Sequence, residues 1–266
     1  MKSPKISIII ATFNAAETLD KCLRSVILQL NEKIELILVD GSSKDSTNEI
    51  IESYGSKIAV HISEPDKGIY DAWNKGVKLA HGQWVAFIGA DDVLLPNALA
   101  HYIDVIEKTP DIDNYDYICA CNEYVDMNGD VLNVIGGAPK WNIYRRRMNA
   151  AHVASLHNKK NLFDTLGGYD LSFKICADYE LLLRKKDKLK YIFIPNHIAR
   201  MQIGGMSFST RAVKETFWIR KKHHSIGCVE NCFLFLRDWA GFKFYCVKQL
   251  VKGRMNIKTF FYYLKR

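Results

Sequence analysis

Two adjacent carboxylates, Asp91 and Asp92, follow the apolar run at residues 84–88. Like charges this close repel each other and lose solvation, so the pair is unfavourable for folding alone. A divalent cation with hard oxygen ligands would remove that cost, above all if it also bound a diphosphate. The structural alternative is a pair that caps the helix expected from Pro96. Of the two, the residues favour a cation site.

A third carboxylate, Asp40, ends the β-branched run at residues 34–39 and precedes Gly41. At the end of a strand, beside a glycine turn, a carboxylate can accept a hydrogen bond from a base or a ribose. Loop and helix-cap chemistry is the alternative. It explains the neighbouring Asp45 and Ser46 well, but Asp40 less well.

The segment 64–76 reads Glu-Pro-Asp-Lys-Gly-Ile-Tyr-Asp-Ala-Trp-Asn-Lys-Gly. Lys67 stands at the start of an expected helix and Lys75 lies within it, where both could bind a diphosphate or nucleotide. The segment also fits an amphipathic helix with Tyr70 and Trp73 in the core and its charges in solvent. Taken alone, it slightly favours this second interpretation.

Asp178 lies where apolar residues 175–177 give way to a helical pattern over residues 178–186. Burial there would raise its pKa towards the range of a general base, whereas a simple helix N-cap is the alternative. His152 and the loop 203–207 are weaker candidates for a site. A lone histidine is more often a satisfied core residue than a ligand.

The motifs of several other enzyme classes are absent from the sequence. No Gly-x-Gly-x-x-Gly follows the first expected strand, which disfavours a dinucleotide-binding oxidoreductase. There is also no Walker loop and no Gly-x-Ser-x-Gly nucleophile turn. A zinc site is disfavoured as well, because its possible ligands lie in an aromatic, basic helical pattern. These possible ligands are His223, His224, Cys228 and Cys232.

The first half of the chain alternates strand and helix patterns. Strands are expected at residues 5–10, 34–39, 58–62 and 84–88. Helices are expected at residues 14–30, opened by an Asn14–Glu17 capping box, and at 46–55 and 69–80. This alternation predicts an α/β fold, a mainly parallel sheet with helices on both faces. Since ligands bind at the carboxyl ends of such strands, the polar residues there should meet at one edge.

The second half is less regular. Strands are expected at residues 117–121, 153–157 and 191–194, with a hairpin around Asn128-Gly129. Helices are expected at residues 159–166 and 178–186. From Arg211 onward the pattern is helical, aromatic and basic.

Length and charge predict a domain at residues 1–210 and a basic, aromatic helical appendage at residues 211–266. The 266 residues carry a net charge of +8, yet the appendage alone holds 13 Lys and Arg against 3 Asp and Glu. Most of the 7 cysteines lie in apolar runs, which favours a reducing compartment, the cytoplasm. No apolar run approaches the roughly 18 residues of a spanning helix.

The appendage interleaves aromatic residues with Lys and Arg, which suits the headgroup region of an anionic bilayer. We therefore expect peripheral contact with the inner face of the plasma membrane. The alternative is a helical lid whose aromatic residues pack on the main domain. No nucleic-acid partner is expected, because the chain has no recognisable module for one.

Taken in order, these segments resemble glycosyltransferase family 2, whose members have the GT-A fold. The resemblance runs from about Ile6 to Ser207 and covers residues 7–14, 39–47, 63–76, 88–92 and Asp178-Tyr-Glu-Leu. The segment 63–76 is similar to a version common in bacterial surface-polysaccharide enzymes. The sequence departs from the family at Gly89, where many members carry Asp, and at Trp73, where many carry Arg.

The resemblance implies roles for individual residues. Asp178 matches the catalytic base, Asp91 the ribose ligand and Asp92 the ligand of Mn²⁺ or Mg²⁺. Further contacts to the nucleotide-sugar are implied at Thr12, Asn14, Asp40, Lys67, Asp71, Asn74 and Lys75. Contacts to the acceptor are expected at His152, Glu180, Gly205 and Ser207.

Together these observations predict an inverting, metal-dependent transferase. It would move one sugar from a nucleotide-sugar, a UDP-sugar before a GDP- or dTDP-sugar, to a glycan or lipid-linked acceptor of a bacterial surface polysaccharide (O-antigen, capsule or exopolysaccharide). Single addition is expected because the Gln-x-x-Arg-Trp signature of processive members is absent. One alternative is a nucleotidyltransferase, but it would need a glycine-rich basic loop after the first strand, which residues 11–16 do not provide. A non-catalytic nucleotide-sugar-binding subunit could keep Asp40 and Asp91 without Asp178.

Overall fold

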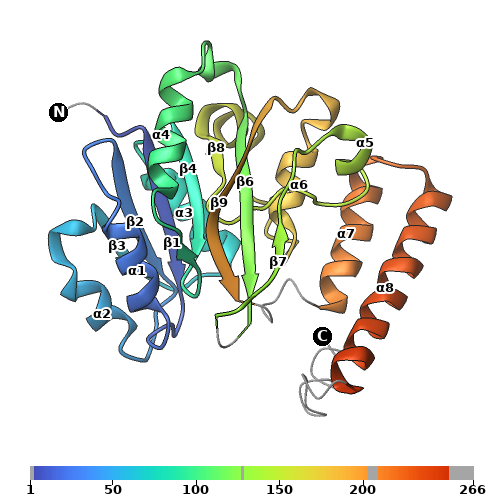
Figure 1. Ribbon diagram of the computed structural model, residues 1–266, viewed down its shortest axis with the longest axis horizontal. Coiled ribbons are helices and arrows are strands. Elements are labelled where there is room, and N and C mark those ends of the chain that lie inside the picture. The colour runs from blue at the N-terminus through green and yellow to red at the C-terminus, as the bar shows by residue number, and fades with distance from the viewer. Residues whose placement is uncertain (1–2, 127–128, 203–208, 252–266) are drawn as a thin grey trace.

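The computed structural model describes residues 3–126, 129–202 and 209–251, and nine strands in this part of the chain form one curled sheet (Figure 1). In spatial order the strands are β3 (Val60–Ser63), β2 (Ile34–Asp40), β1 (Ile6–Thr12), β4 (Trp84–Gly89), β8 (Leu156–Asn158), β6 (Tyr117–Val125), β9 (Tyr191–Gln202) and β5 (Val93–Leu94). The remaining strand, β7 (Val131–Ile135), pairs with β6.

The helices are α1 (Leu19–Ile27), α2 (Thr47–Ser53), α3 (Ile69–Leu79), α4 (Ala98–Lys108), α5 (Trp141–Tyr144), α6 (Ala177–Leu183), α7 (Thr210–His223) and α8 (Cys228–Val251). Their alternation with the strands confirms the expected α/β fold.

The sheet has a parallel half and a mixed half. Strands β3, β2, β1 and β4 run parallel, and their register places Thr12 opposite Asp40 and Asp40 opposite Ser63. The carboxyl ends of these strands therefore meet at one edge, as expected. In the other half β8 is antiparallel to β4 and β6, whereas β6 and β9 run parallel.

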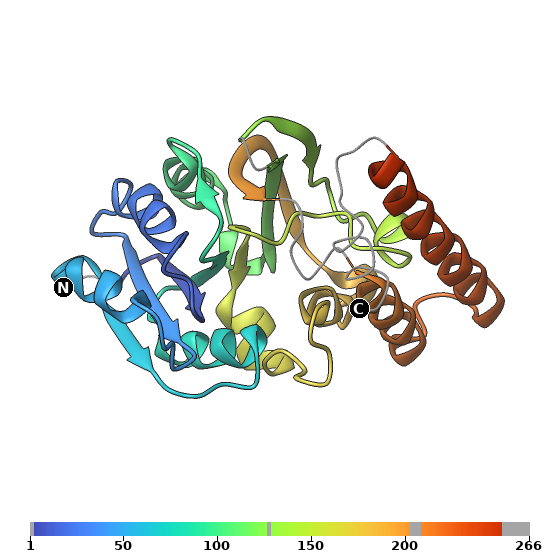
Figure 2. The ribbon, with the colours of Figure 1, turned by 90° about the horizontal axis from the view of Figure 1, so that it is seen from below.

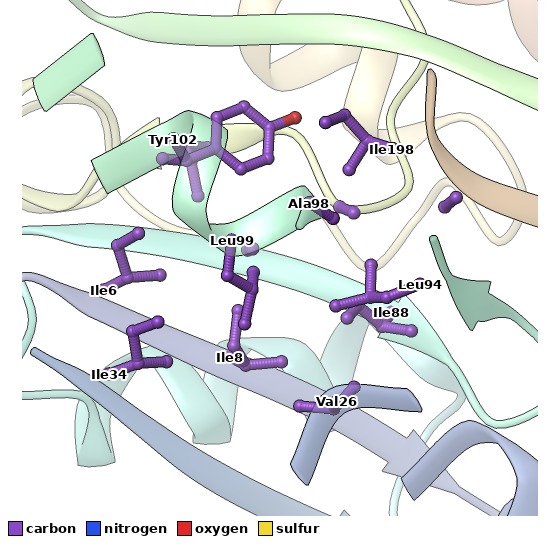
Figure 3. Close-up of a cluster of buried hydrophobic side chains, with 14 of the residues drawn as sticks. Ile6, Ile8, Val26, Ile34, Ile88, Leu94, Ala98, Leu99, Tyr102 and Ile198 are labelled. Carbon is purple, nitrogen blue, oxygen red and sulfur yellow. The ribbon is translucent and has the colours of Figure 1, made fainter. Parts of the chain in front are cut away.

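Both faces of the parallel half are covered, which explains its almost continuously apolar strands. Alternate residues of β1 point to opposite faces. Ile6 and Ile8 pack with Leu99 and Tyr102 of α4 on one face (Figure 3). Ile9 packs on the other face in the cluster that includes α3 and α6.

One expected local structure is wrong. Helix α1 begins at Leu19, and the capping box at Asn14 does not form, because Asn14 adopts the left-handed conformation (φ 49°) and its side chain accepts a hydrogen bond from the Lys44 N–H. The helix expected at residues 159–166 is present, and its residues 159–164 are π-helical.

Helices α7 and α8 lie side by side at the end of the molecule opposite β3 (Figures 1 and 2). Helix α7 joins the core, since Ile219 is fully buried in the cluster that contains α6. Asn231 of α8 holds the two helices together by accepting a hydrogen bond from Arg220 and donating one to the Phe217 carbonyl. Among the described helices, none has the length and apolar character needed to cross a bilayer.

Candidate active site

Asp91 and Asp92 lie at the carboxyl edge of the parallel half, directly after β4. Asp91 is exposed and Asp92 is buried. A Cβ atom added to Gly89 would lie 2.7 Å from Asp92 Oδ2 and 2.9 Å from Asp91 Oδ1, so both carboxylates converge above this glycine. The absence of a side chain at Gly89, a departure from many family members, is therefore what lets the pair fold over the strand end.

This carboxylate pair fits a hard divalent cation. Burial and the charge of Asp91 raise the pKa of Asp92 well above its usual value, which is the destabilisation that a bound cation relieves. One oxygen of Asp92 accepts a hydrogen bond from the Gly89 N–H at 2.9 Å and thereby orients the carboxylate. Within the described ranges, no group of three or more His, Cys, Asp or Glu residues is placed to hold a metal.

Asp40 is fully buried at the end of β2 and accepts several hydrogen bonds. The donors are the side chains of Thr12, Ser43, Asn48 and Ser63 and the Ser43 N–H. Burial alone would raise the pKa of Asp40, but these hydrogen bonds outweigh it and lower that pKa. A carboxylate has about four lone-pair sites, so the acceptor sites of Asp40 are already occupied. Its hydrogen bonds join the ends of β1, β2 and β3.

An unassigned pair, Phe13 and Asp66, lies beside Asp40. The Phe13 ring is 65% exposed. A Cβ atom on Gly41 would lie 2.5 Å from Asp66 Oδ2 and 3.3 Å from the Phe13 ring, so the ring and the carboxylate flank this glycine. An exposed aromatic face next to an acceptor oxygen suits a flat base with an N–H edge. The sequence could have indicated this pair, since Phe13 and Asp66 lie in the segments 7–14 and 63–76 that resemble the family.

The residues around α3 that the resemblance implies as nucleotide-sugar contacts mostly form hydrogen bonds or ion pairs with neighbouring loops. Asn74 uses both ends of its amide on the backbone of Tyr169. Lys75 pairs with Glu64 and donates to the Pro65 carbonyl. Asp71 accepts a hydrogen bond from the N–H of Lys67, whose side chain is exposed at the start of the helix.

Asp178 lies in the first turn of α6, with its side chain 16% exposed. Burial raises its pKa, against smaller opposing effects of the Tyr179 N–H and the Tyr70 hydroxyl. The Tyr70 hydroxyl lies 3.0 Å from Asp178 Oδ1 and 2.6 Å from the Ile175 carbonyl. A partly accessible carboxyl with a raised pKa is suited to accept a proton.

His152 lies beside Asp178, with Nδ1 3.8 Å from Asp178 Oδ2. Its ring stacks on Phe87 at 5.7 Å and tilts against Trp73 at 5.2 Å. Neither ring nitrogen has a hydrogen-bond partner within residues 3–126, 129–202 and 209–251. Burial lowers the pKa of His152 to about 3, so the ring is neutral. It therefore offers a donor and an acceptor next to Asp178.

A chain of direct contacts joins the two acidic sites, although 86 residues separate Asp92 from Asp178 in sequence. Phe87 of β4, two residues before Gly89, stacks on His152, whose Nδ1 lies 3.8 Å from Asp178 Oδ2. Burial raises the pKa of Tyr124 of β6, and the charges of Asp92 and Asp178 raise it further.

Glu180, expected near the acceptor, points instead into the contact between α6 and α7. It is fully buried, and its carboxylate is paired with Arg184, Lys222 and His223. Burial alone would raise its pKa, yet hydrogen bonds from these three residues lower it to about 2. Contact with an acceptor would require displacing them. The other expected acceptor residues, Gly205 and Ser207, lie outside the described residues.

Glu215 of α7 is a positioning residue that sequence reasoning missed. Its carboxylate accepts hydrogen bonds from the N–H groups of Lys174, Ile175 and Cys176, each at 2.9 Å. These residues directly precede α6, so Glu215 fixes the backbone that presents Asp178. A carboxylate 37 positions away from Asp178 carries no local signal of this role.

Comparison with known proteins identifies relatives of this chain. The family model described as Glycosyl transferase family 2 matches residues 7–159. The PGL/p-HBAD biosynthesis glycosyltransferase of Mycobacterium tuberculosis is 35% identical over 194 residues, which is 69% of this chain and 70% of that protein. A glycosyltransferase of Rickettsia prowazekii is 31% identical over 189 residues, 67% of this chain and 58% of that protein.

Solved structures share the fold. S. aureus TarS 1-349 in complex with UDP-GlcNAc matches with a TM-score of 0.64 and 17% identity, over 91% of this chain and 73% of that one. The mannosyltransferase PcManGT from Pyrobaculum calidifontis, in complex with GDP-Man and Mn²⁺, matches with a TM-score of 0.65 and 14% identity, over 93% of this chain and 76% of that one. The fold is that of the GT-A glycosyltransferases.

Fold and sequence together define the class of the protein as a glycosyltransferase. The chain belongs to glycosyltransferase family 2.

Proposed function

We propose that this glycosyltransferase is inverting and metal-dependent and adds a single sugar from a nucleotide-sugar. The proposal rests above all on one observation. The carboxylate pair above Gly89 directly follows β4, whose Phe87 stacks on His152, and His152 Nδ1 lies 3.8 Å from Asp178 Oδ2, so direct contacts join the pair to Asp178. A leaving diphosphate and an attacking hydroxyl need such groups close together.

In the proposed reaction, Asp178 accepts the proton of an acceptor hydroxyl as its oxygen attacks the anomeric carbon. The bond from that carbon to the diphosphate oxygen breaks in the same displacement, so the configuration inverts. Tyr70 orients the Asp178 carboxylate throughout. Asp92, with Asp91 beside it, would hold Mn²⁺ or Mg²⁺, which supplies charge stabilisation to the leaving diphosphate when bound.

A UDP-sugar is the donor we propose first, and a GDP- or dTDP-sugar second. The TarS structure with UDP-GlcNAc and the PcManGT structure with GDP-Man and Mn²⁺ support a nucleotide-sugar donor on this fold. Phe13 and Asp66 would meet the base, Asp91 the ribose and Lys67 the phosphates. The loops that carry these contacts would be held in place by the remaining implied residues, which are Thr12, Asn14, Asp40, Asp71, Asn74 and Lys75.

We propose a glycan or lipid-linked acceptor of a bacterial surface polysaccharide, bound at His152. The mycobacterial relative named for PGL/p-HBAD biosynthesis supports an acceptor of this class. We also propose that the chain works in the cytoplasm at the inner face of the plasma membrane. The excess of Lys and Arg in residues 211–266 supports contact with anionic lipid there.

Thermal unfolding with UDP, GDP and dTDP, each with and without Mn²⁺, tests the donor site. A nucleoside diphosphate at about 100 times its Kd should stabilise the wild type by about 2.7 kcal/mol, and only with Mn²⁺ present. Asp92→Ala should remove the metal-dependent part. Asp104→Ala, which changes an exposed aspartate of α4, is the matched control and should behave as wild type. Unchanged metal-dependent stabilisation in Asp92→Ala would exclude Asp92 as the metal ligand.

A further inference from the structure

Helix α8 has an inner face that is already used. Asn231, Leu234 and Cys246 are buried on this face. Asn231 bonds to α7, and Phe235 packs on Phe217 of α7 with ring centroids 5.3 Å apart. This side of α8 therefore belongs to the fold.

The outer face of α8 is apolar as well, although its side chains are exposed and the helix lies at the edge of the molecule (Figures 1 and 2). Phe233 is 65% exposed, Leu236 62% and Phe244 71%. Spacings of three, four, seven, eight and eleven residues place such side chains on one face of a helix. We call this surface the outer stripe. Its members are Val229, Phe233, Leu236, Phe244 and Val247.

Basic side chains border the outer stripe. Arg237 and Lys248 are exposed, and Lys243 lies over the Trp239 ring at 3.6 Å from its centroid. The two acidic residues of α8 are paired: Glu230 with Arg146, and Asp238 with Arg237. The sequence that follows, residues 252–266, adds five Lys and Arg and no Asp or Glu.

We propose that the outer stripe of α8 lies in the headgroup region of an anionic bilayer, with α7 and the catalytic domain on its cytoplasmic side. This inference rests on the proposed contact with the membrane and identifies the surface that makes it. An exposed apolar face bordered by cations is what an interfacial helix presents to anionic lipid. A second copy of this chain fits less well, because its own basic border would be repelled by an identical one.

Sedimentation of the full chain with vesicles tests the inference. The vesicles contain phosphatidylcholine with about one third phosphatidylglycerol, or phosphatidylcholine alone. The wild type should sediment with the anionic vesicles, and less so with neutral vesicles or in high salt. Phe233→Gln/Phe244→Gln removes apolar surface without changing charge and should weaken partitioning by about tenfold or more.

Leu28→Gln is the matched control, since Leu28 is 86% exposed and directly follows α1, which lies far from α8 in Figure 1. It should bind vesicles as the wild type does. The folding of each variant is checked by circular dichroism, and its oligomeric state by size-exclusion chromatography with light scattering. If the double variant is folded and binds as the wild type does, the outer stripe is excluded while the basic membrane contact stands.

If the wild type is dimeric and the double variant monomeric, with equal vesicle binding, the stripe is a self-interface and the inference is wrong. If the wild type does not bind anionic vesicles, both the inference and the proposed membrane contact fail. Donor hydrolysis, measured without vesicles, remains the separate test of the proposed transfer activity.

Discussion

The parallel half of the sheet and the region that follows it build their parts of the site by different means. In the first region, residues 6–108, the site residues lie within a few positions of a strand end or a helix start. In the second, residues 117–223, Asp178 is placed by the distant residues Tyr70 and Glu215. The first region is thus local in construction, whereas the second depends on long-range contacts.

This difference suggests a division of labour. Lys67 and Asp91 of the first region are exposed and would bind the donor in the proposed reaction. The second region supplies the proposed base and the neutral His152. Substitutions in the second region should therefore separate donor binding from transfer, and the expected effects decrease from Asp178 through Glu180 to His152.

Asp178→Asn should give the largest effect. Without a positioned base, transfer and donor hydrolysis should fall by about two to four orders of magnitude. Stabilisation by a nucleoside diphosphate with Mn²⁺ should remain as in the wild type, because the substitution leaves the residues at the carboxyl ends of the parallel strands unchanged. Product release in single-turnover assays measures the first effect, and thermal unfolding measures the second.

The exposed Asp187 provides the control, and Asp187→Asn should transfer normally. Near-normal transfer by Asp178→Asn would place the base elsewhere, with Asp170 as the next carboxylate to examine. Equal loss of transfer and of nucleotide binding would instead contradict the division between the two regions.

The sequence predicted the first region well because its geometry is repetitive. Parallel strands bring their carboxyl ends together, so the polar residues after β1, β2 and β4 could be assigned to one edge before any contact was known. The side-chain partners could not be read in the same way. Asp40 looked like a ligand, yet its acceptors are filled by residues from the ends of two other strands, as its hydrogen bonds with Thr12 of β1 and Ser63 of β3 show.

The second region could be predicted only in part. Asp178 stood out because an acidic residue followed apolar ones at a helix start. Glu180 looked equally available, but its burial depends on Lys222 and His223, which lie more than 40 positions further along the chain. Likewise, residues 211–266 were expected as an appendage from their helical, aromatic and basic pattern, which gave no sign that Glu215 and Ile219 tie α7 to α6 and its core.

Glu180→Gln tests this tie and should give the second-largest effect. Removing the charge leaves Lys222 and His223 without their buried partner, which should cost about 3 kcal/mol of unfolding free energy. Denaturant unfolding at neutral pH measures the loss. Glu49→Gln, in the first turn of α2, is a control that should change stability little. A loss below about 0.5 kcal/mol for Glu180→Gln would show that α7 is held by other contacts.

The same network predicts that the free energy of unfolding decreases at acidic pH. The pKa of Glu180 is lowered to about 2 in the folded chain, so the unfolded chain binds a proton more readily at this site. Its stabilisation is therefore complete above the ordinary glutamate range and declines as the pH falls from about 5 towards 2. The wild type should lose this increment over that interval, and Glu180→Gln should lose less. Parallel curves for both would contradict the assignment.

His152 should give the smallest effect and the most specific one. Its Nδ1 atom lies 3.8 Å from Asp178 Oδ2, too far for a hydrogen bond between them. An acceptor oxygen at about 2.8 Å from each atom would bridge this gap, donating its proton to Asp178 and receiving a hydrogen bond from His152. His152→Leu should therefore lower transfer by about tenfold to a hundredfold, mainly through a higher KM for the acceptor, with unchanged binding of the nucleotide.

His152→Asn is the matched variant, since its amide nitrogen can reach the Nδ1 position and should restore part of the lost transfer. A packing role alone would be served better by Leu than by Asn, because the ring lies between Trp73 and Phe87. Greater activity with Leu than with Asn would therefore assign His152 to packing. Because the pKa of His152 is only about 3, the ring should stay neutral between pH 5 and 8. The pH dependence of transfer in that interval should consequently be the same in the wild type and in His152→Asn.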